Sequence, residues 1–249
     1  MTYATSRGRA RIGVMVPFTN TNLEPDLIMM CPPGVSVHIT RLGGYDEDEI
    51  PDEDQMAGLG ASDMGGTLSL LQGVKPDVIQ YGCTSATLAH GPSFDSALAQ
   101  QIKAQAGAQT VTAAGAVVHA LKSLGAHNVA FASPYVPSLN DRAIAYLADE
   151  GITAVSRADV TERLGNAGQG AMTPEAVKTL ARRADCDQAQ AIVLSCTDMR
   201  STEVIAQIEA ELGKPVVTSN QAMMFQTLQC LGITDVPAGF GQLMERLHI

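Results

Sequence analysis

The chain has 249 residues, of which 45% are hydrophobic and 17% charged, and this composition excludes a disordered protein. Its formal net charge is −10 and it has no long cluster of lysine and arginine, so nucleic acid is excluded as a partner. The apolar runs fall far short of the roughly 20 residues of a membrane helix, and no membrane partner is expected.

Alternating β-rich and helical segments predict an α/β fold in which helices connect parallel strands. In the first half we expect, in chain order, strand Arg11–Val16, helix Leu23–Met30, strand Val35–Thr40, helix Met56–Gly73, strand Asp77–Tyr81, helix Ser93–Ala106, strand Gln109–Thr112 and helix Gly115–Leu124. The pattern then restarts with strand Asn128–Ala132, helix Leu139–Glu150, strand Ile152–Ser156, helix Pro174–Ala184, strand Ala191–Ser195, helix Thr202–Leu212, strand Pro215–Thr218 and helix Gln221–Leu231.

The second half also repeats the residues of the first. Three segments match in the same order: Val16–Phe18 with Ser133–Tyr135, Ile79–Thr84 with Ile192–Thr197, and Thr110–Thr112 with Val216–Thr218. Such self-similarity predicts two doubly wound lobes related by a pseudo-twofold axis. By that symmetry the helix after each lobe's last strand packs on the other lobe. We therefore expect an N-terminal lobe of residues 1–115 plus 222–249 and a C-terminal lobe of residues 116–221.

The N-terminal segment and the cysteines favour a cytoplasmic protein. The segment MTYATSRGRARIG has basic residues but no apolar stretch of a secretory signal. Five cysteines are an odd number, which argues against a disulfide framework. We expect reduced thiols and a cytoplasmic location.

Cys83 and Cys196 occupy equivalent positions in the repeat, each just after a buried strand. Ligands of open parallel sheets bind outside the carboxyl ends of the strands, so both thiols are expected to face one cleft between the lobes. Backbone N–H groups at a helix start can lower the pKa of a thiol. The neighbouring hydroxyls of Thr84, Ser85 and Thr197 could hold a carboxylate. A small dicarboxylate or amino-acid-like substrate would place its middle carbons between the sulfurs.

Other interpretations of these side chains are weaker. Free cysteine is usually a small buried hydrophobe, and we apply that interpretation to Cys31, Cys186 and Cys230. No CxxC or HxxxH spacing predicts a metal, and His90, which follows Cys83, is expected at a helix start. A Cys-His hydrolase would lack a recognisable partner motif. No GxGxxG or GxxxxGK[ST] motif supports a nucleotide, so no cofactor is expected.

An acidic run follows the second expected strand. It extends from Asp46 to Glu49 and continues to Glu53 and Asp54. A metal-binding loop is one interpretation, but the run lacks the ligand spacing and turn glycine of a calcium loop. We expect a solvated loop.

Six segments carry a family resemblance over nearly the whole chain: VPFTNTNLEPD, YGCTSATLAHG, SPYVPSLN, GNAGQGAMTP, LSCTDMRS and KPVVTSNQA. With them the chain resembles the aspartate/glutamate racemase superfamily and, within it, the maleate cis-trans isomerase and arylmalonate decarboxylase branch. The resemblance implies two Rossmann-like lobes, an active site in the interlobe cleft, cofactor-independent chemistry and small carboxylate substrates.

The resemblance also implies roles for particular residues. Cys83 is similar to the nucleophilic cysteine of the isomerases and Cys196 to their second, proton-handling cysteine. Asn20, Tyr135 and Asn166 resemble substrate-contacting residues. Without the family, the turn interpretation would be favoured for the two asparagines, and the tyrosine could equally be ordinary packing.

Two features bear on the reaction. The loop around Asn166 departs from the family pattern, since Gly165 replaces an aspartate and Gln169 a valine. The decarboxylases of this branch generally keep only the second cysteine, so having both favours an isomerase or a racemase. We expect a maleate-type cis-trans isomerisation through a cysteine adduct. A two-cysteine amino-acid or hydantoin racemase, a malonate-type decarboxylase and a carboxylate-binding protein on the same scaffold remain alternatives, and a homo-oligomer is possible.

Overall fold

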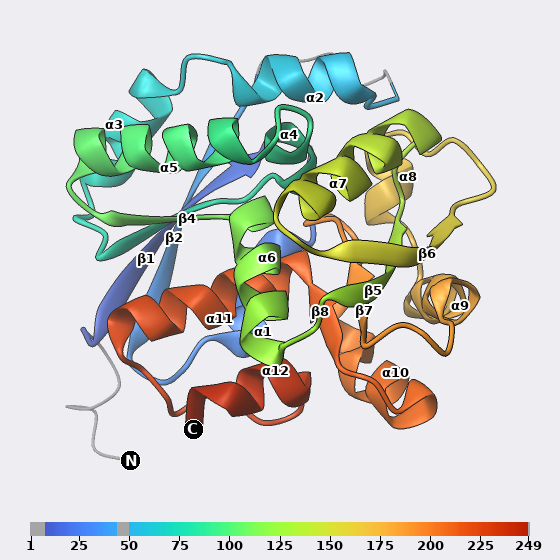
Figure 1. Cartoon of the computed structure of the whole chain (residues 1–249). Helices are drawn as coiled ribbons and strands as arrows, with labels where there is room; N and C mark the ends of the chain where they lie inside the picture. Colours follow the sequence, from blue (N-terminus) through green and yellow to red (C-terminus); the bar gives the residue numbers. More distant parts are fainter. Residues whose placement is uncertain (1–7, 44–49, 249) are drawn as a thin grey trace.

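The computed structural model describes residues 8–43 and 50–248, so the acidic run from Asp46 to Glu49 lies outside the described residues. The strands described form two parallel four-stranded sheets, in the orders β2-β1-β3-β4 and β6-β5-β7-β8 (Figure 1). Their bounds are β1 (Ala10–Pro17), β2 (Val35–Leu42), β3 (Val78–Tyr81), β4 (Gln109–Thr112), β5 (Asn128–Ser133), β6 (Thr153–Asp159), β7 (Ala191–Leu194) and β8 (Val216–Thr218). The predicted α/β class with two similar lobes is confirmed.

Helices connect and cover these strands. Their bounds are α1 (Leu23–Met30), α2 (Glu53–Gly60), α3 (Gly65–Gln72), α4 (Thr84–Leu88), α5 (Pro92–Ala106), α6 (Ala113–Leu124), α7 (Pro137–Asp149), α8 (Asn166–Gly170), α9 (Pro174–Ala184), α10 (Ile205–Leu212), α11 (Ser219–Leu231) and α12 (Gly241–Glu245), with 3₁₀ turns at Thr202–Val204 and Arg246–His248. Within residues 8–43 and 50–248, every helix is too short or too polar to cross a membrane.

The single helix predicted over Met56–Gly73 is wrong, because two helices occupy this segment. Helix α2 ends at Gly60, and Ala61 closes it with αR geometry. The carboxylate of Asp63 then accepts a hydrogen bond from the N–H of Gly65, 2.9 Å away, at the start of α3. A short acidic side chain that binds the backbone two residues ahead favours a turn over a continuing helix.

The strands next to the thiols are buried on both faces. All four residues of β3 and all four of β7 are buried, as continuous strands in the middle of a covered parallel sheet should be. In the first sheet, β2 lies on one side of β1 and β3 on the other, and the second sheet repeats this around β5. The carboxyl ends of β1 and β3, and of β5 and β7, are therefore the points at which each sheet reverses its strand order, where ligands bind.

Helices α6 and α11 join the two lobes. Each follows the last strand of its sheet, and the two pack against one another between the lobes (Figure 1). Helix α11 also contacts α1, β3 and β4 of the first lobe. There the Nε2 atom of Gln80 donates to the hydroxyl of Thr227, 2.8 Å away. The exact division into residues 1–115 plus 222–249 and 116–221 stays a prediction.

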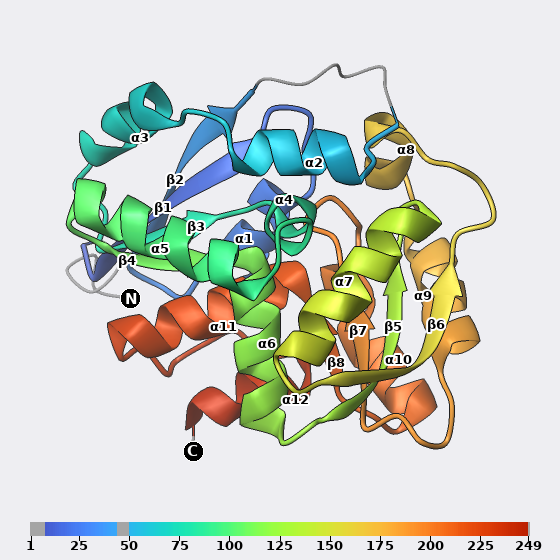
Figure 2. The same ribbon diagram turned by 45° about the horizontal axis from the view of Figure 1, so that its top comes forward.

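Helix α2 bridges the lobes on the opposite side. It lies over α4 in Figure 1 and Figure 2, and it contacts α7 of the second lobe. The hydroxyl of Ser138 at the start of α7 donates to the carboxylate of Glu53, 2.5 Å away. The cleft between the lobes is thus covered by α2, which starts soon after the acidic run.

Candidate active site

A small cavity lies where the carboxyl ends of both sheets meet, and it contains both predicted thiols. Its volume is about 30 Å³. The first lobe contributes Pro17, Thr19, Asn20, Pro51, Met56, Cys83 and Ser85, and the second contributes Tyr135, Asn166, Gln169, Cys196, Thr197 and Asp198. The structure therefore brings together all of the predicted site residues except Thr84.

Cys83 stands at the N-cap position of α4, two residues after β3. Its sulfur lies 3.6 Å from the hydroxyl of Ser85. Burial raises the pKa of the thiol, while the Ser85 hydroxyl and the backbone N–H groups of Ala86 and Ser85 lower it. The expected lowering of this pKa is wrong in sign, because loss of hydration outweighs the helix-start donors. The donors around the sulfur are nevertheless those that stabilise a thiolate.

Cys196 occupies the equivalent position, two residues after β7. Burial, and then the nearby carboxylate of Asp198, raise the pKa of this thiol to about 12. The backbone N–H of Asp198, which lies 3.3 Å from the sulfur, and the Tyr135 hydroxyl act in the opposite direction. The thiol itself donates to the side-chain oxygen of Gln169 at 3.8 Å. Cys196 is thus held in its protonated form at neutral pH.

Thr197 ties the two thiol loops together. Its hydroxyl donates to the carbonyl oxygen of Gly82 at 3.0 Å and accepts from the Nδ2 atom of Asn20 at 3.0 Å. The Oδ1 atom of Asn20 accepts from the N–H of Leu23 at 2.9 Å, at the start of α1. Thr197 and Asn20 therefore line the cavity and also connect the two lobes. The hydrogen bond from Leu23 to Asn20 agrees with the turn role considered for this asparagine.

Thr84 is the predicted residue that the structure places elsewhere. Its hydroxyl donates to the hydroxyl of Ser219, 2.9 Å away, and both side chains are buried at the junction of α4 and α11. The hydroxyl of Thr84 is thus engaged between the two helices, and Thr84 is not among the residues that line the cavity. Its predicted contact with substrate stays a prediction.

Several residues of the cavity had no role in the sequence interpretation. Met56 and Pro51 come from α2 and the segment before it, and only tertiary structure brings them over the thiols. Gln169 was noted only as a departure from a family pattern. Asp198 is 8% exposed and could have been found from its place two residues after Cys196, at the carboxyl edge of the sheet.

The Asp198 carboxylate links β7 to the start of α1. Its Oδ1 atom accepts from the N–H of Thr21 at 2.8 Å, from the N–H of Asn22 at 3.1 Å and from the Nδ2 atom of Asn22 at 3.0 Å. Burial raises the pKa of this carboxyl group, while these donors lower it. A helix start with free N–H groups favours the ionised form.

The structure contains little that would hold a metal. Within the described residues, no group of three or more histidine, cysteine, aspartate or glutamate side chains could bind an ion. His90 lies outside the cavity, stacked on Phe94, and its Nε2 atom contacts the carbonyl oxygen of Ala57 at 2.7 Å. His90 lies in the turn between α4 and α5 rather than beside either thiol.

Comparison with known proteins agrees with this geometry. Residues 62–244 match the family model of arylmalonate decarboxylase. The maleate isomerase of Nocardia farcinica is 30% identical over 96% of this chain and 97% of its own. The arylmalonate decarboxylase of Bordetella bronchiseptica is 27% identical over 68% of this chain and 71% of its own.

A solved structure is also similar over nearly its full length. It is a cysteine-to-serine variant of the Nocardia farcinica maleate cis-trans isomerase with a covalently bound succinylcysteine intermediate. The TM-score is 0.86 at 27% identity, and the alignment covers 95% of this chain and 98% of the other.

Proposed function

This chain belongs to the family of arylmalonate decarboxylase and maleate isomerase, and we propose that it is a cofactor-independent cis-trans isomerase of a maleate-type acid that works through a cysteine adduct. One observation carries this proposal. Cys83 and Cys196 reach the same cavity from equivalent ends of two similar sheets. A flat alkene between them would have one sulfur on each side.

The surroundings of the sulfurs support different roles. Cys83 has the Ser85 hydroxyl and two backbone N–H groups, which stabilise a thiolate. The carboxylate of Asp198 raises the pKa of both thiols, but it is the second cause for Cys196 and the last for Cys83, so it favours the protonated thiol chiefly at Cys196. We therefore assign Cys83 as the nucleophile and Cys196 as the proton donor.

The reaction then balances without a cofactor. The Cys83 thiolate forms a bond to one alkene carbon, and the electron pair of the double bond moves onto the carboxylate attached to the other alkene carbon, which becomes an enediolate. Cys196 donates its proton to the other alkene carbon and becomes a thiolate. The carbon–carbon bond, now single, rotates. Cys196 takes the proton back, the carbon–sulfur bond breaks, and the trans acid leaves.

The cavity must widen to admit such a substrate. Its volume of about 30 Å³ has room for roughly two water molecules. Met56 and Pro51 line it from the side of α2. Movement of these residues on binding would exclude water from the enediolate and strengthen its hydrogen bonds.

A racemase is the second candidate, because it also needs one thiol on each side of its substrate. There one cysteine would remove an α-proton and the other would return one on the opposite face. The two functions differ in whether a carbon–sulfur bond forms.

Proton NMR separates these functions directly. The protein is incubated in deuterated buffer with a reductant and EDTA, first with maleate and then with aspartate, glutamate and a hydantoin. An isomerase converts the alkene signal of maleate into that of fumarate, whereas a racemase removes the α-proton signal of an amino acid or hydantoin. The Cys230→Ala variant is the matched control, since Cys230 is exposed on α11. Conversion of no alkene substrate would overturn the proposal.

A further inference from the structure

Asp198 presents one carboxylate oxygen that the protein itself does not use. All of its hydrogen bonds within the described residues are made by Oδ1, at 2.8 to 3.4 Å. Oδ2 accepts none there, although the side chain is only 8% exposed and lines the thiol cavity. Oδ2 is not among the fully sealed side-chain oxygens of the described residues, so a hydrogen-bond donor of a bound ligand can reach it.

The charges of the cavity favour such a donor over a second anion. Its lining includes the carboxylate of Asp198 and no lysine, arginine or histidine. The same holds for the adjoining depression of about 490 Å³, which shares Thr19, Asn166 and Asp198 with it. Arg200, close by in the sequence, is paired with Glu203 at 2.8 Å. Among the described residues, nothing neutralises Asp198 except the N–H donors on Oδ1.

The space beside Oδ2 is kept open by a glycine. A Cβ atom at Gly170, the last residue of α8, would lie 2.9 Å from Oδ2, closer than such atoms approach one another. The backbone of Gly170 is held there because its carbonyl accepts from the Nδ2 atom of Asn22 at 3.0 Å. The oxygen therefore remains accessible from the depression that adjoins the thiols.

From this geometry we propose that Oδ2 of Asp198 binds an N–H group of the substrate. The inference rests on the proposed function and narrows its substrate class. The preferred substrate is a cis-alkene acid with a carboxylate at one end and an N–H donor, such as a primary amide, at the other. The amide end lies against Asp198, and the carboxylate lies toward the hydroxyl and backbone donors after Cys83. A dicarboxylate would place its second charge against Asp198.

Maleate and its monoamide, maleamate, test this directly, because they differ in one acyl group. We expect the native protein to have the higher kcat/KM with maleamate, by about tenfold or more, since a hydrogen bond to a charged group has at least this effect. The Asp198→Asn variant keeps an oxygen for Thr21 and Asn22 but loses the charge. It should lower kcat/KM for maleamate and raise it for maleate, so that the ratio of the two falls at least about tenfold.

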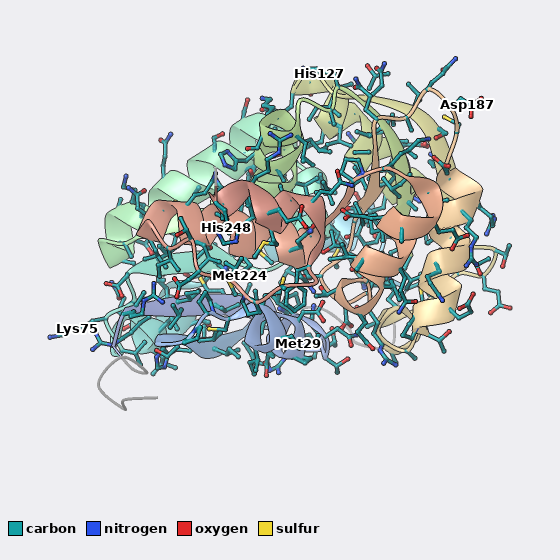
Figure 3. The ribbon with its side chains drawn as sticks, turned by 90° about the horizontal axis from the view of Figure 1, so that it is seen from below. Met29, Lys75, His127, Asp187, Met224 and His248 are labelled. Carbon is teal, nitrogen blue, oxygen red and sulfur yellow. The ribbon has the colours of Figure 1, made fainter. Side chains whose placement is uncertain are left out.

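The control is Asp187→Asn, which removes the same charge from an exposed turn at the outer edge of the second lobe (Figure 3). It should leave the ratio unchanged. If Asp198→Asn lowers both rates equally, Asp198 only positions α1 and the inference is wrong. A native preference for maleate overturns it even if the variant does not fold. Failure of both substrates to react would instead contradict the proposed function, whatever the role of Asp198.

Discussion

The hydroxyl of Thr197 donates a hydrogen bond to the carbonyl oxygen of Gly82, 3.0 Å away across the interlobe cleft. Thr197 directly follows Cys196 and Gly82 directly precedes Cys83. One hydrogen bond therefore connects the two loops that carry the thiols. Both partners are backbone or short side-chain groups, so the bond leaves the loops little freedom to move apart.

Replacement of Thr197 by valine should loosen this connection. Thr197→Val keeps the volume but removes the donor to Gly82 and the acceptor for Asn20, leaving two buried groups unpaired. We expect the free energy of unfolding to fall by about 1–3 kcal/mol, measured by urea denaturation, and kcat to fall with it. Thr197→Ser keeps the hydroxyl and should preserve most of kcat. Equal stability of the valine and native proteins would show that the bond is unimportant.

The two thiols should respond differently to removal. Cys83→Ala deletes the atom that bonds carbon, so isomerisation should vanish. Cys196→Ala keeps the nucleophile and loses the proton donor, a change typically worth about 10²–10⁴-fold, so slow turnover should remain. Cys83→Ser should restore little, because a serine hydroxyl without a base is a poor nucleophile. An equal loss in both alanine variants would favour a racemase, and full activity of Cys83→Ala would refute the assignment.

The pH profile should follow the ionisation of Cys83. Burial raises the pKa of this thiol above its usual value of 9.0, so its reactive thiolate becomes more abundant as the pH rises. The pKa of Cys196, at about 12, keeps the proton donor in its acid form over the same range. We therefore expect kcat/KM to increase through the alkaline range with no falling limb while the protein stays folded. A profile already flat at neutral pH would contradict this.

Stability should depend on the buried carboxyl group of Asp26 in α1. Burial raises its pKa from 3.8 to about 6, although Thr202 and Asn220 donate hydrogen bonds to it. A carboxyl group with a raised pKa in the folded state stabilises the fold while protonated. This stabilisation is lost as the pH rises from about 4 to about 6, and it amounts to about 3 kcal/mol.

The Asp26→Asn variant should remove this part of the pH dependence. Denaturation of the variant and the native protein across that range measures the difference. Asp187→Asn, which changes an exposed carboxylate, should leave the native pH dependence intact. Parallel curves for the Asp26 variant and the native protein would show that this group does not govern the change.

Much of the fold was predictable because it depends on local patterns. Helices Leu23–Met30 and Pro174–Ala184 and strand Gln109–Thr112 have the predicted bounds. The internal repeat also predicted that both thiols face one cavity. Helices α4, α8 and α12 were missed, because five residues are too few to display a helical period. The family resemblance is confirmed by the match to arylmalonate decarboxylase and maleate isomerase.

The remaining features depend on contacts between distant residues. The pKa of Cys83 was predicted in the wrong direction because burial is a property of the whole fold. The bond of Thr84 to Ser219 and the place of Met56 in the cavity lining join segments far apart in sequence. The sequence showed that Asp198 is a charged residue near the end of a strand. It could not show which of its carboxylate oxygens accepts hydrogen bonds from the protein. The cytoplasmic location, the oligomeric state and the lobe boundaries stay predictions.

The central claim is that Cys83 forms a carbon–sulfur bond with an alkene acid, and mass spectrometry of a stalled reaction tests it most directly. The Cys196→Ser variant is incubated with maleate and, separately, with maleamate, then quenched, digested and mapped. The account predicts one added substrate molecule on Cys83 and none on Cys31, Cys186 or Cys230. The account would be contradicted if the native protein isomerises the acid but the Cys196→Ser variant carries the adduct on a cysteine other than Cys83.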